Sequence, residues 1–319
     1  MLHRQVIGIV GAGQVGMAAA YAVLQQKSAS EIVLVDRDQR RAEGEAMDLM
    51  HAQGYVGRCR VRAGGYADLA AASVIMISAG VGQRPGESRL DLLNRNATVF
   101  GEIAAELDRH APEAILLIAT NPVDVLTYVM QSLSRRPARR IIGTGTMLDT
   151  TRFRTLLSEH YGCDPRSVHA LIVGEHGDTE VPAWSCASIA GTPIVGNTIL
   201  GHPYEGDVLQ SIFERVRRAA YEIIERKGYT NWAIGLVLAH LLRTIQDDQN
   251  SLLPVSVRLD GEYGLSDVCL SLPAAIGIDG VNGLAPPPLD AAEEAALRDS
   301  ARVLRASLDA IRIEPPVRA

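Results

Sequence analysis

Short apolar runs alternate with longer amphipathic stretches over the first half of the chain. The runs are rich in β-branched residues and lie at Val6–Val10, Glu31–Val35, Ser73–Ile77, Ala114–Ile118 and Arg140–Ile142. The amphipathic stretches between them are Gln14–Gln26, Arg40–His51, Leu90–His110 and Val123–Ser134. Apolar runs of this length are typical of strands buried on both faces of a parallel sheet. The repeated strand–helix units therefore predict a doubly wound α/β domain over residues 1–143.

The rhythm changes at about Thr144. From there the pattern predicts a helix, two strands, a long helical region broken at Gly228, a hairpin turning at Asp260-Gly261 and a last helix. In that order they are Asp149–His160, Val168–Val173, Ala183–Ile189, Glu205–Gln246, Val255–Leu259 with Val268–Leu272, and Asp290–Ile311. This mixture predicts a second, α+β domain over residues 144–319. We expect its helical part near residues 232–250 to pack back on the first domain.

Composition and charge argue against several classes of partner. The chain has 319 residues, of which 47 % are hydrophobic, and a formal net charge of -6. Nucleic acids and membrane surfaces favour a basic face, so neither is an expected partner. The apolar runs are too short to cross a membrane, and Met1 leads almost directly into a strand without room for a signal peptide. The four cysteines form no CxxC pair. We therefore expect a cytoplasmic protein with reduced thiols and no metal.

A glycine-rich turn joins the first predicted strand to the helix after it. Residues 11–16 read GAGQVG, which matches the GxGxxG fingerprint of Rossmann-type dinucleotide sites and contains Val15. Gly11 permits the tight turn, Gly13 lets the backbone approach a pyrophosphate, and Gly16 lets helix and strand pack closely. The helix N-terminus stabilises the pyrophosphate charge. The alternative is a turn of the same kind in a domain that binds no nucleotide.

Asp36 ends the second predicted strand, twenty residues after Gly16. A carboxylate at this place binds both ribose hydroxyls and repels a 2′-phosphate, so it favours NAD over NADP as the cofactor. The adjacent Arg37 is a weaker signal in the opposite direction.

Three polar residues are candidates for chemistry on a small 2-oxo or 2-hydroxy acid. His176 lies in the turn GEHGD at residues 174–178, and Asp149 and Arg152 share one face of a predicted helix. We expect Asp149 to hold one nitrogen of His176 and raise its pKa, so that the histidine moves a proton. Arg152 would grip the substrate carboxylate. A surface ion pair and a structural histidine are the alternatives, but ligands bind at the carboxyl ends of parallel strands, which favours the site.

Two further candidates follow neighbouring strands. The segment AGVGQRPGESR at residues 79–89 contains three glycines, which predicts a lid that brings Arg89 to the reacting carbonyl. Asn121 is a candidate donor to the substrate oxygen. The alternatives are an ordinary long loop with a solvated arginine, and an N-cap at Asn121 with Pro122 in the first helical position.

Taken together, these motifs resemble those of the L-lactate/malate dehydrogenase family over nearly the whole chain. The matching segments are GAGQVG, VD at 35–36, QRPGESR, TNPVD, LDTTR and GEHGD. The resemblance implies reversible, NAD-dependent hydride transfer between lactate and pyruvate, with His176 as proton donor and acceptor. Malate or another 2-hydroxy acid is the alternative substrate. A nucleotide-binding protein that kept the fold and lost catalysis is the alternative from another class.

Within this family, the residue matching Gln83 separates substrates. Arginine there meets a second carboxylate, whereas glutamine leaves that charge without a buried partner and favours pyruvate. Arg84, one residue further on, keeps malate open. The resemblance also implies that Thr230 limits the substrate side chain and that Ile234 forms an apolar wall for the nicotinamide, with plain helix packing as the alternative. Gly82 departs from the family, whose lactate-specific members commonly have asparagine there.

Arg154 and His169 match residues that bind fructose 1,6-bisphosphate across a subunit interface in some bacterial members of the family. Arg154 lies two residues after Arg152 and hence about 200° around the helix, away from the substrate site. The resemblance thus implies a homo-oligomer, expected to be a tetramer, with an effector site. The alternative is an interface ion pair at Arg154 and an ordinary strand residue at His169.

Overall fold

The computed structural model describes residues 5–82 and 86–311, and for Arg89 the backbone alone. Its centre is a nine-stranded sheet in the order β14-β13-β12-β6-β5-β4-β1-β2-β3. The strands are β1 Val6–Val10, β2 Glu31–Val35, β3 Arg60–Ala63, β4 Ala72–Ile77, β5 Ile115–Ile118, β6 Ile141–Gly143, β12 Ser251–Asp260, β13 Ser266–Gly277 and β14 Gly280–Leu284. The first six pair in parallel, whereas β12, β13 and β14 pair antiparallel.

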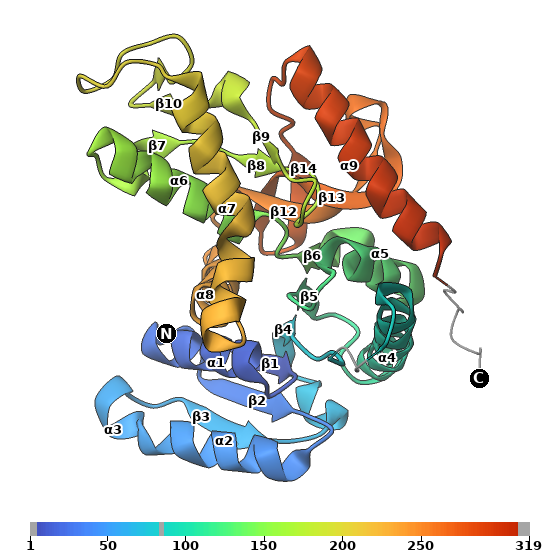
Figure 1. Cartoon of the computed structure of the whole chain (residues 1–319). Helices are drawn as coiled ribbons and strands as arrows, with labels where there is room; N and C mark the ends of the chain where they lie inside the picture. Colours follow the sequence, from blue (N-terminus) through green and yellow to red (C-terminus); the bar gives the residue numbers. More distant parts are fainter. Residues whose placement is uncertain (1–4, 83–85, 312–319) are drawn as a thin grey trace.

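Helices pack around this sheet and around a smaller second layer (Figure 1). They are α1 Gln14–Gln25, α2 Gln39–His51, α3 Gln53–Val56, α4 Arg89–His110, α5 Val123–Leu133, α6 Met147–Tyr161, α7 Gly206–Lys227, α8 Trp232–Gln246 and α9 Ala291–Asp309. Short 3-10 turns are η1 Tyr66–Leu69, η2 Ala138–Arg140, η3 Pro165–Ser167, η4 Trp184–Cys186 and η5 Glu262–Gly264. In the part of the chain described here, no helix is long and apolar enough to cross a membrane.

The predicted α/β fold is confirmed in its central part. Strands β1, β2, β4, β5 and β6 lie where the apolar runs predict them, and the core strands are almost fully buried. The break predicted at Gly228 is also correct. Gly228 adopts a left-handed conformation (φ 85°) that ends α7 before α8 begins, and glycine takes this conformation without a Cβ penalty.

Two strand predictions need correction, and four strands are not predicted: β3, β9 Val181–Pro182, β11 Thr192–Pro193 and β14. The strands β3 and β14 give no apolar run, because β3 is an arginine-rich edge strand and β14 contains two glycines. The predicted strand Val168–Val173 is two short strands in different sheets, β7 Val168–His169 and β8 Ile172–Val173. The predicted strand Ala183–Ile189 is wrong over its first part, where η4 lies, and within it only β10 Ser188–Ile189 is a strand.

The second layer has its own apolar core. The layer consists of α6 and α7 over β7, β10 and β11 Thr192–Pro193. Phe153 is among the fully buried side chains of its core. The strand β8 pairs instead with β9 Val181–Pro182. Helix α8 returns to the large sheet and packs on α1, where a Cβ on Gly235 would lie 2.7 Å from the carbonyl carbon of Ala18. Helix α8 therefore links the C-terminal half of the chain to the glycine turn that precedes α1.

Candidate active site

The glycine turn between β1 and α1 has the geometry that the fingerprint predicts. Gly11 has a φ of +106°, and a Cβ there would lie 2.5 Å from the backbone nitrogen of Ala79. A Cβ on Gly16 would lie 1.9 Å from the carbonyl oxygen of Gly11. A Cβ on Gly13, in contrast, would meet nothing within 4 Å, and no side chain caps the N-terminus of α1. The turn therefore leaves an open approach to free backbone N–H groups, while Val15 packs against the core.

Asp36 closes this turn from the end of β2. Its Oδ2 accepts a hydrogen bond from the backbone N–H of Ala12 (2.7 Å), and its Oδ1 accepts one from Asp38 (2.9 Å). The carboxylate lines a cavity of about 540 Å³ whose walls include Val10, Val35, Val81 and Ile103. The size and the apolar walls are those of a small-molecule or cofactor site.

The rim of this cavity is acidic. Glu102 and Glu106 line it together with Asp36, opposed by Arg37. Burial, and then the charges of these three carboxylates, raise the pKa of the neighbouring Tyr66 to about 12. An additional phosphate on a ligand here would meet three negative charges, so the rim disfavours a 2′-phosphate.

The three residues predicted for substrate chemistry lie together. Asp149 is only 3 % exposed and its Oδ2 lies 2.5 Å from His176 Nδ1. Its Oδ1 accepts a hydrogen bond from Arg152 Nη1 (2.9 Å). The ring of His176 remains 23 % exposed, and its Nε2 has no hydrogen-bond partner among the described residues. The buried carboxylate of Asp149 thus orients both His176 and Arg152, and the ring of His176 remains accessible to a ligand.

The charge of Asp149 controls the protonation of His176. Burial alone lowers the pKa of His176, but the charge and hydrogen bond of Asp149 outweigh it and raise the pKa to about 9. Burial in turn raises the pKa of Asp149, whereas His176 and Arg152 lower it, and the net direction is downward. The pair therefore rests as imidazolium and carboxylate at neutral pH, which is a proton donor ready for use.

A second buried carboxylate, which the sequence analysis did not single out, fixes the main chain of His176. Asp124, on α5, accepts a hydrogen bond from the backbone N–H of His176 (2.7 Å) and another from Ser256 Oγ (2.6 Å). Burial raises the pKa of Asp124 to about 6, although both hydrogen bonds act against this. The signal in the sequence was the acid in TNPVD, one position from the start of a predicted helix.

Glu180 is a further residue that the sequence did not reveal. It is 6 % exposed, and its Oε1 is buried without a hydrogen-bond partner among the described residues. Burial, and then the charge of Asp149, raise the pKa of Glu180 to about 8, against an opposing effect of His176. A buried carboxyl group without a partner favours its neutral form. It therefore adds a titrating group beside the histidine.

The loops at the carboxyl ends of β4 and β5 are tied together. Thr120 Oγ1 donates to the carbonyl of Ala79 (2.7 Å), and Asn96 accepts from the backbone of Val81 (2.9 Å). Asn121 is exposed between β5 and α5. Its alternative interpretation as an N-cap is wrong, because Pro122 is the N-cap and the Asn121–Pro122 peptide is cis.

Part of the predicted lid lies outside the described residues. Residues 83–85, which include Gln83 and Arg84, are not described, and only the backbone of Arg89 is described, at the start of α4. The part of the lid that is described is held by Arg95, which donates to the carbonyl of Gly82 (2.8 Å) and pairs with Glu87 (2.6 Å). These bonds connect both sides of the segment to α4.

Comparison with known proteins places this geometry in a family. The model of the lactate/malate dehydrogenase NAD-binding domain matches residues 5–143, and that of the α/β C-terminal domain matches residues 146–314. The chain belongs to the lactate/malate dehydrogenase family. It is 59 % identical to the L-lactate dehydrogenase of Salinibacter ruber over 96 % of this chain and 98 % of that protein. It is 47 % identical to that of Thermus aquaticus, over 96 % of this chain and 99 % of that one.

A solved structure leads to the same family. The minor L-lactate dehydrogenase from Enterococcus mundtii, in its ligands-bound form, superposes with a TM-score of 0.94 at 40 % identity. The match covers 97 % of this chain and 99 % of that chain. As a member of this family, the protein is an NAD-dependent oxidoreductase with a Rossmann-type first domain.

The residues of this dehydrogenase fit NAD. The open space at Gly13 and the uncapped N-terminus of α1 suit a pyrophosphate, and Asp36 at the end of β2 suits the ribose hydroxyls. The apolar cavity walls suit an adenine ring. Among the described residues, no cluster of histidine, cysteine or acidic side chains is built to hold a metal ion.

The remaining predicted residues of the dehydrogenase lie around this centre or behind it. Thr230 is half-buried between α7 and α8, and Ile234 packs against the large core from the first turn of α8. No hydrogen bond in the described parts of the chain joins Thr230 or Asn121 to His176. Arg154 points away from the substrate face. On that other side, its Nε donates to the carbonyl of Ala170 (2.8 Å), the residue next to the exposed His169.

Proposed function

We propose that the protein is an NAD-dependent L-lactate dehydrogenase, which interconverts lactate and pyruvate with His176 as the proton donor and acceptor. The observation that carries the proposal is the contact of Asp149 with both His176 and Arg152. This arrangement supports a proton donor beside a guanidinium at the carboxyl edge of a dinucleotide-binding sheet. The L-lactate dehydrogenases among its relatives, similar over nearly the whole chain, support the substrate.

In this proposal the site residues divide the work. Arg152 keeps Nε and Nη2 free of partners among the described residues, and these two atoms bind the substrate carboxylate as a fork. His176 gives its Nε2 proton to the carbonyl oxygen during reduction and takes the hydroxyl proton during oxidation. Asp149 stabilises the imidazolium and keeps the ring oriented. A bound nicotinamide would supply the hydride chemistry, and Ile234 would form an apolar wall of its site.

The lid residues complete the site. Arg89, at the start of α4, polarises the reacting carbonyl, and Asn121 donates to the same oxygen. Gln83 sets the substrate: glutamine offers no charge to the second carboxylate of oxaloacetate, so that carboxylate would be desolvated without a partner. Thr230 limits the size of the substrate side chain.

The four cysteines are unpaired, as in a reducing compartment, and we infer that the protein is cytoplasmic.

The substrate is tested by comparing the consumption of NADH with pyruvate and with oxaloacetate. We expect a higher kcat/KM for pyruvate in the wild type, and a shift of the ratio toward oxaloacetate in Gln83→Arg. A guanidinium at this position pairs with the second carboxylate and is left unpaired when pyruvate binds. A wild type that prefers oxaloacetate would instead identify a malate dehydrogenase, and an unchanged ratio in Gln83→Arg would remove residue 83 from the substrate site.

We also infer a homotetramer that responds to fructose 1,6-bisphosphate through Arg154 and His169. Exposed apolar side chains on α7 and α8 support association, among them Tyr221, Trp232 and Leu236. The effector should lower the KM for pyruvate and promote the tetramer, because a ligand that prefers the active arrangement increases its population. The double variant Arg154→Gln/His169→Gln should lose both responses. Sedimentation behaviour and reaction rates that do not change when the effector is added would contradict the inference.

A further inference from the structure

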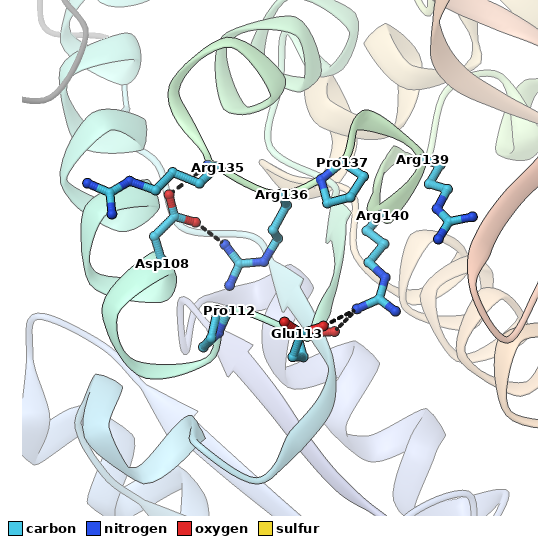
Figure 2. A pocket seen from close by; sticks show the side chains of 8 residues that line it. All are labelled: Asp108, Pro112, Glu113, Arg135, Arg136, Pro137, Arg139 and Arg140. Atoms are coloured by element: carbon cyan, nitrogen blue, oxygen red, sulfur yellow. Dashed lines mark hydrogen bonds and ion pairs between the residues drawn. The ribbon is translucent and has the colours of Figure 1, made fainter.

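A second cavity, of about 460 Å³, lies at the opposite edge of the sheet from the candidate active site. Its walls are the last turn of α4, the turn that leads into β5, and the segment 135–140 that leads into β6 (Figure 2). These are the amino ends of β5 and β6, whereas Asp36 and Asn121 follow carboxyl ends of strands. The cavity is therefore separate from the substrate and cofactor residues.

The lining of this cavity is strongly basic for a chain of net charge -6. Four of its eight lining residues are arginines, and two are acids. The sequence of the segment is RRPARR at residues 135–140. The arginines are Arg135, Arg136, Arg139 and Arg140, and we refer to these four residues as the arginine row.

The side chain of Arg136 is fully paired within the protein and has a structural role. This side chain is 1 % exposed and pairs with Asp108, while its Nη2 donates to the carbonyls of Leu107 (2.7 Å) and Ala111. Asp108 is used on both oxygens, since Oδ2 also accepts from the backbone N–H of Arg135 (2.8 Å). Arg136 thereby neutralises both the acid and the carbonyl end of α4. The cavity keeps no free negative charge on this side.

Arg140 is only partly satisfied. Its Nη1 donates to the carbonyl and to the carboxylate of Glu113, both at 2.8 Å, and its Nη2 lies 3.6 Å from Asp279. Its Nε is buried and has no partner among the described residues. The pairing of Arg140 with acidic groups is thus incomplete, and its side chain remains 20 % exposed in the cavity wall.

The side chains of Arg135 and Arg139 have no hydrogen bond or ion pair in the described parts of the chain. Figure 2 shows them at opposite ends of the arginine row, with Arg136 and Arg140 between them. The two acids of the lining are already paired with these inner arginines. Two guanidinium groups, separated along one concave surface, therefore remain available to a ligand.

We propose that this cavity binds a small anion that carries two or more phosphate groups, either joined directly to each other or attached at different positions of one molecule. Guanidinium groups bind phosphate oxygens through two parallel hydrogen bonds, and a concave site strengthens them by excluding water. Arg135 and Arg139 bind the outer phosphate oxygens, and Arg140 adds a positive charge between them. The volume is in the range of small-ligand pockets, whereas nucleic acids engage many phosphates along an extended basic surface.

Inorganic tripolyphosphate is a suitable probe for calorimetric titration. The titration uses the variant Arg154→Gln/His169→Gln saturated with NADH, so that neither the proposed effector site nor the pyrophosphate turn contributes. We expect one binding event, with weaker binding of inorganic monophosphate, which spans only one end of the row. Adding Arg135→Gln/Arg139→Gln should weaken tripolyphosphate binding by about tenfold or more, as expected for two charge-assisted contacts.

A matched control removes the same charge elsewhere. Arg166→Gln/Arg302→Gln also lowers the net charge by two, at exposed arginines in η3 and α9, which do not line this cavity. This control should bind tripolyphosphate as the parent does. The proposal is overturned by an absence of binding, by unchanged binding in Arg135→Gln/Arg139→Gln, or by an equal loss in both double variants, which would mean general electrostatic attraction.

Discussion

The carboxylate of Asp124 accepts a hydrogen bond from the backbone N–H of His176, 2.7 Å away. Asp124 belongs to α5 of the first domain, and His176 follows β8 of the second. Asp149 holds the ring of His176 from a third element, α6. The ring and the main chain of the candidate catalytic histidine are thus fixed by separate buried carboxylates.

Asp124 should act as a positioning residue for His176. Its substitution should therefore lower turnover but leave the affinity for NADH unchanged. Asp124→Ala leaves the N–H of His176 and the hydroxyl of Ser256 unpaired, and we expect kcat to fall by about tenfold or more. Asp124→Asn retains a side-chain oxygen for the N–H and should recover most of the activity. Ser256→Ala, which spares the bond to His176, is the milder control. Equal losses in the Asn and Ala variants, or a parallel loss of NADH affinity, would argue against positioning.

The pH profile should report the proton on His176. Pyruvate reduction needs the imidazolium, so its kcat/KM should be level below about pH 9 and fall above it, as the pKa of about 9 requires. Lactate oxidation needs the neutral ring and should rise toward the same pH. Asp149→Asn removes the charge that raises this pKa, so the break should move to the ordinary value of 6.5 or below. A break that stays near pH 9 in Asp149→Asn would show that another group controls the profile.

Glu180 should extend the alkaline range of the reduction. Its pKa is about 8, so it ionises before His176 loses its proton, and the new negative charge helps to retain that proton. In Glu180→Gln the descending limb for pyruvate should shift to lower pH, with kcat below pH 7 little changed. Glu294→Gln, a partly buried acid paired with Arg298 on α9, provides the control for net charge. Superimposable profiles for wild type and Glu180→Gln would refute the coupling.

The wild type should prefer NADH to NADPH, because Asp36 and the acidic rim formed with Glu102 and Glu106 repel a 2′-phosphate. Asp36→Ala should reduce the preference by about tenfold, the size of one screened charge interaction. The measurement is the ratio of kcat/KM for the two cofactors, with Glu45→Gln, a partly buried acid paired with Arg41 on α2, as the control for net charge. Equal use of both cofactors by the wild type would mean that Arg37 dominates.

The sequence predicts most of the fold where burial dictates the residue pattern. The strands β1, β2, β4 and β5 are apolar because helices cover both faces, so their runs are visible, whereas the edge strand β3 carries arginines and is not. The turn at Gly11 is visible because a required backbone conformation restricts the residue. Asp149, Arg152 and His176 follow from spacing and residue type, and the structure places them in contact.

The rest of the site depends on contacts between residues far apart in the chain. Ser256 lies 132 residues from Asp124, and no local pattern connects them. Glu180 follows the turn that contains His176, and nothing in the local sequence distinguishes it from a surface acid. Only its burial without a partner among the described residues raises its pKa. The arginine row is visible as a charge run, but only the pairing of its inner members distinguishes it from a solvated surface.

The antiparallel pairing of β12 with β6 joins the two halves of the chain into one sheet. Ser256 pairs with Gly143, where a Cβ would lie 2.7 Å from that of Ser256. A hinge between cofactor and substrate domains would break this ladder and separate Asp124 from Ser256. Rotation of one domain against the other would therefore cost this pairing. We expect the substrate to be enclosed by short segments at the edge of the sheet and not by a domain hinge.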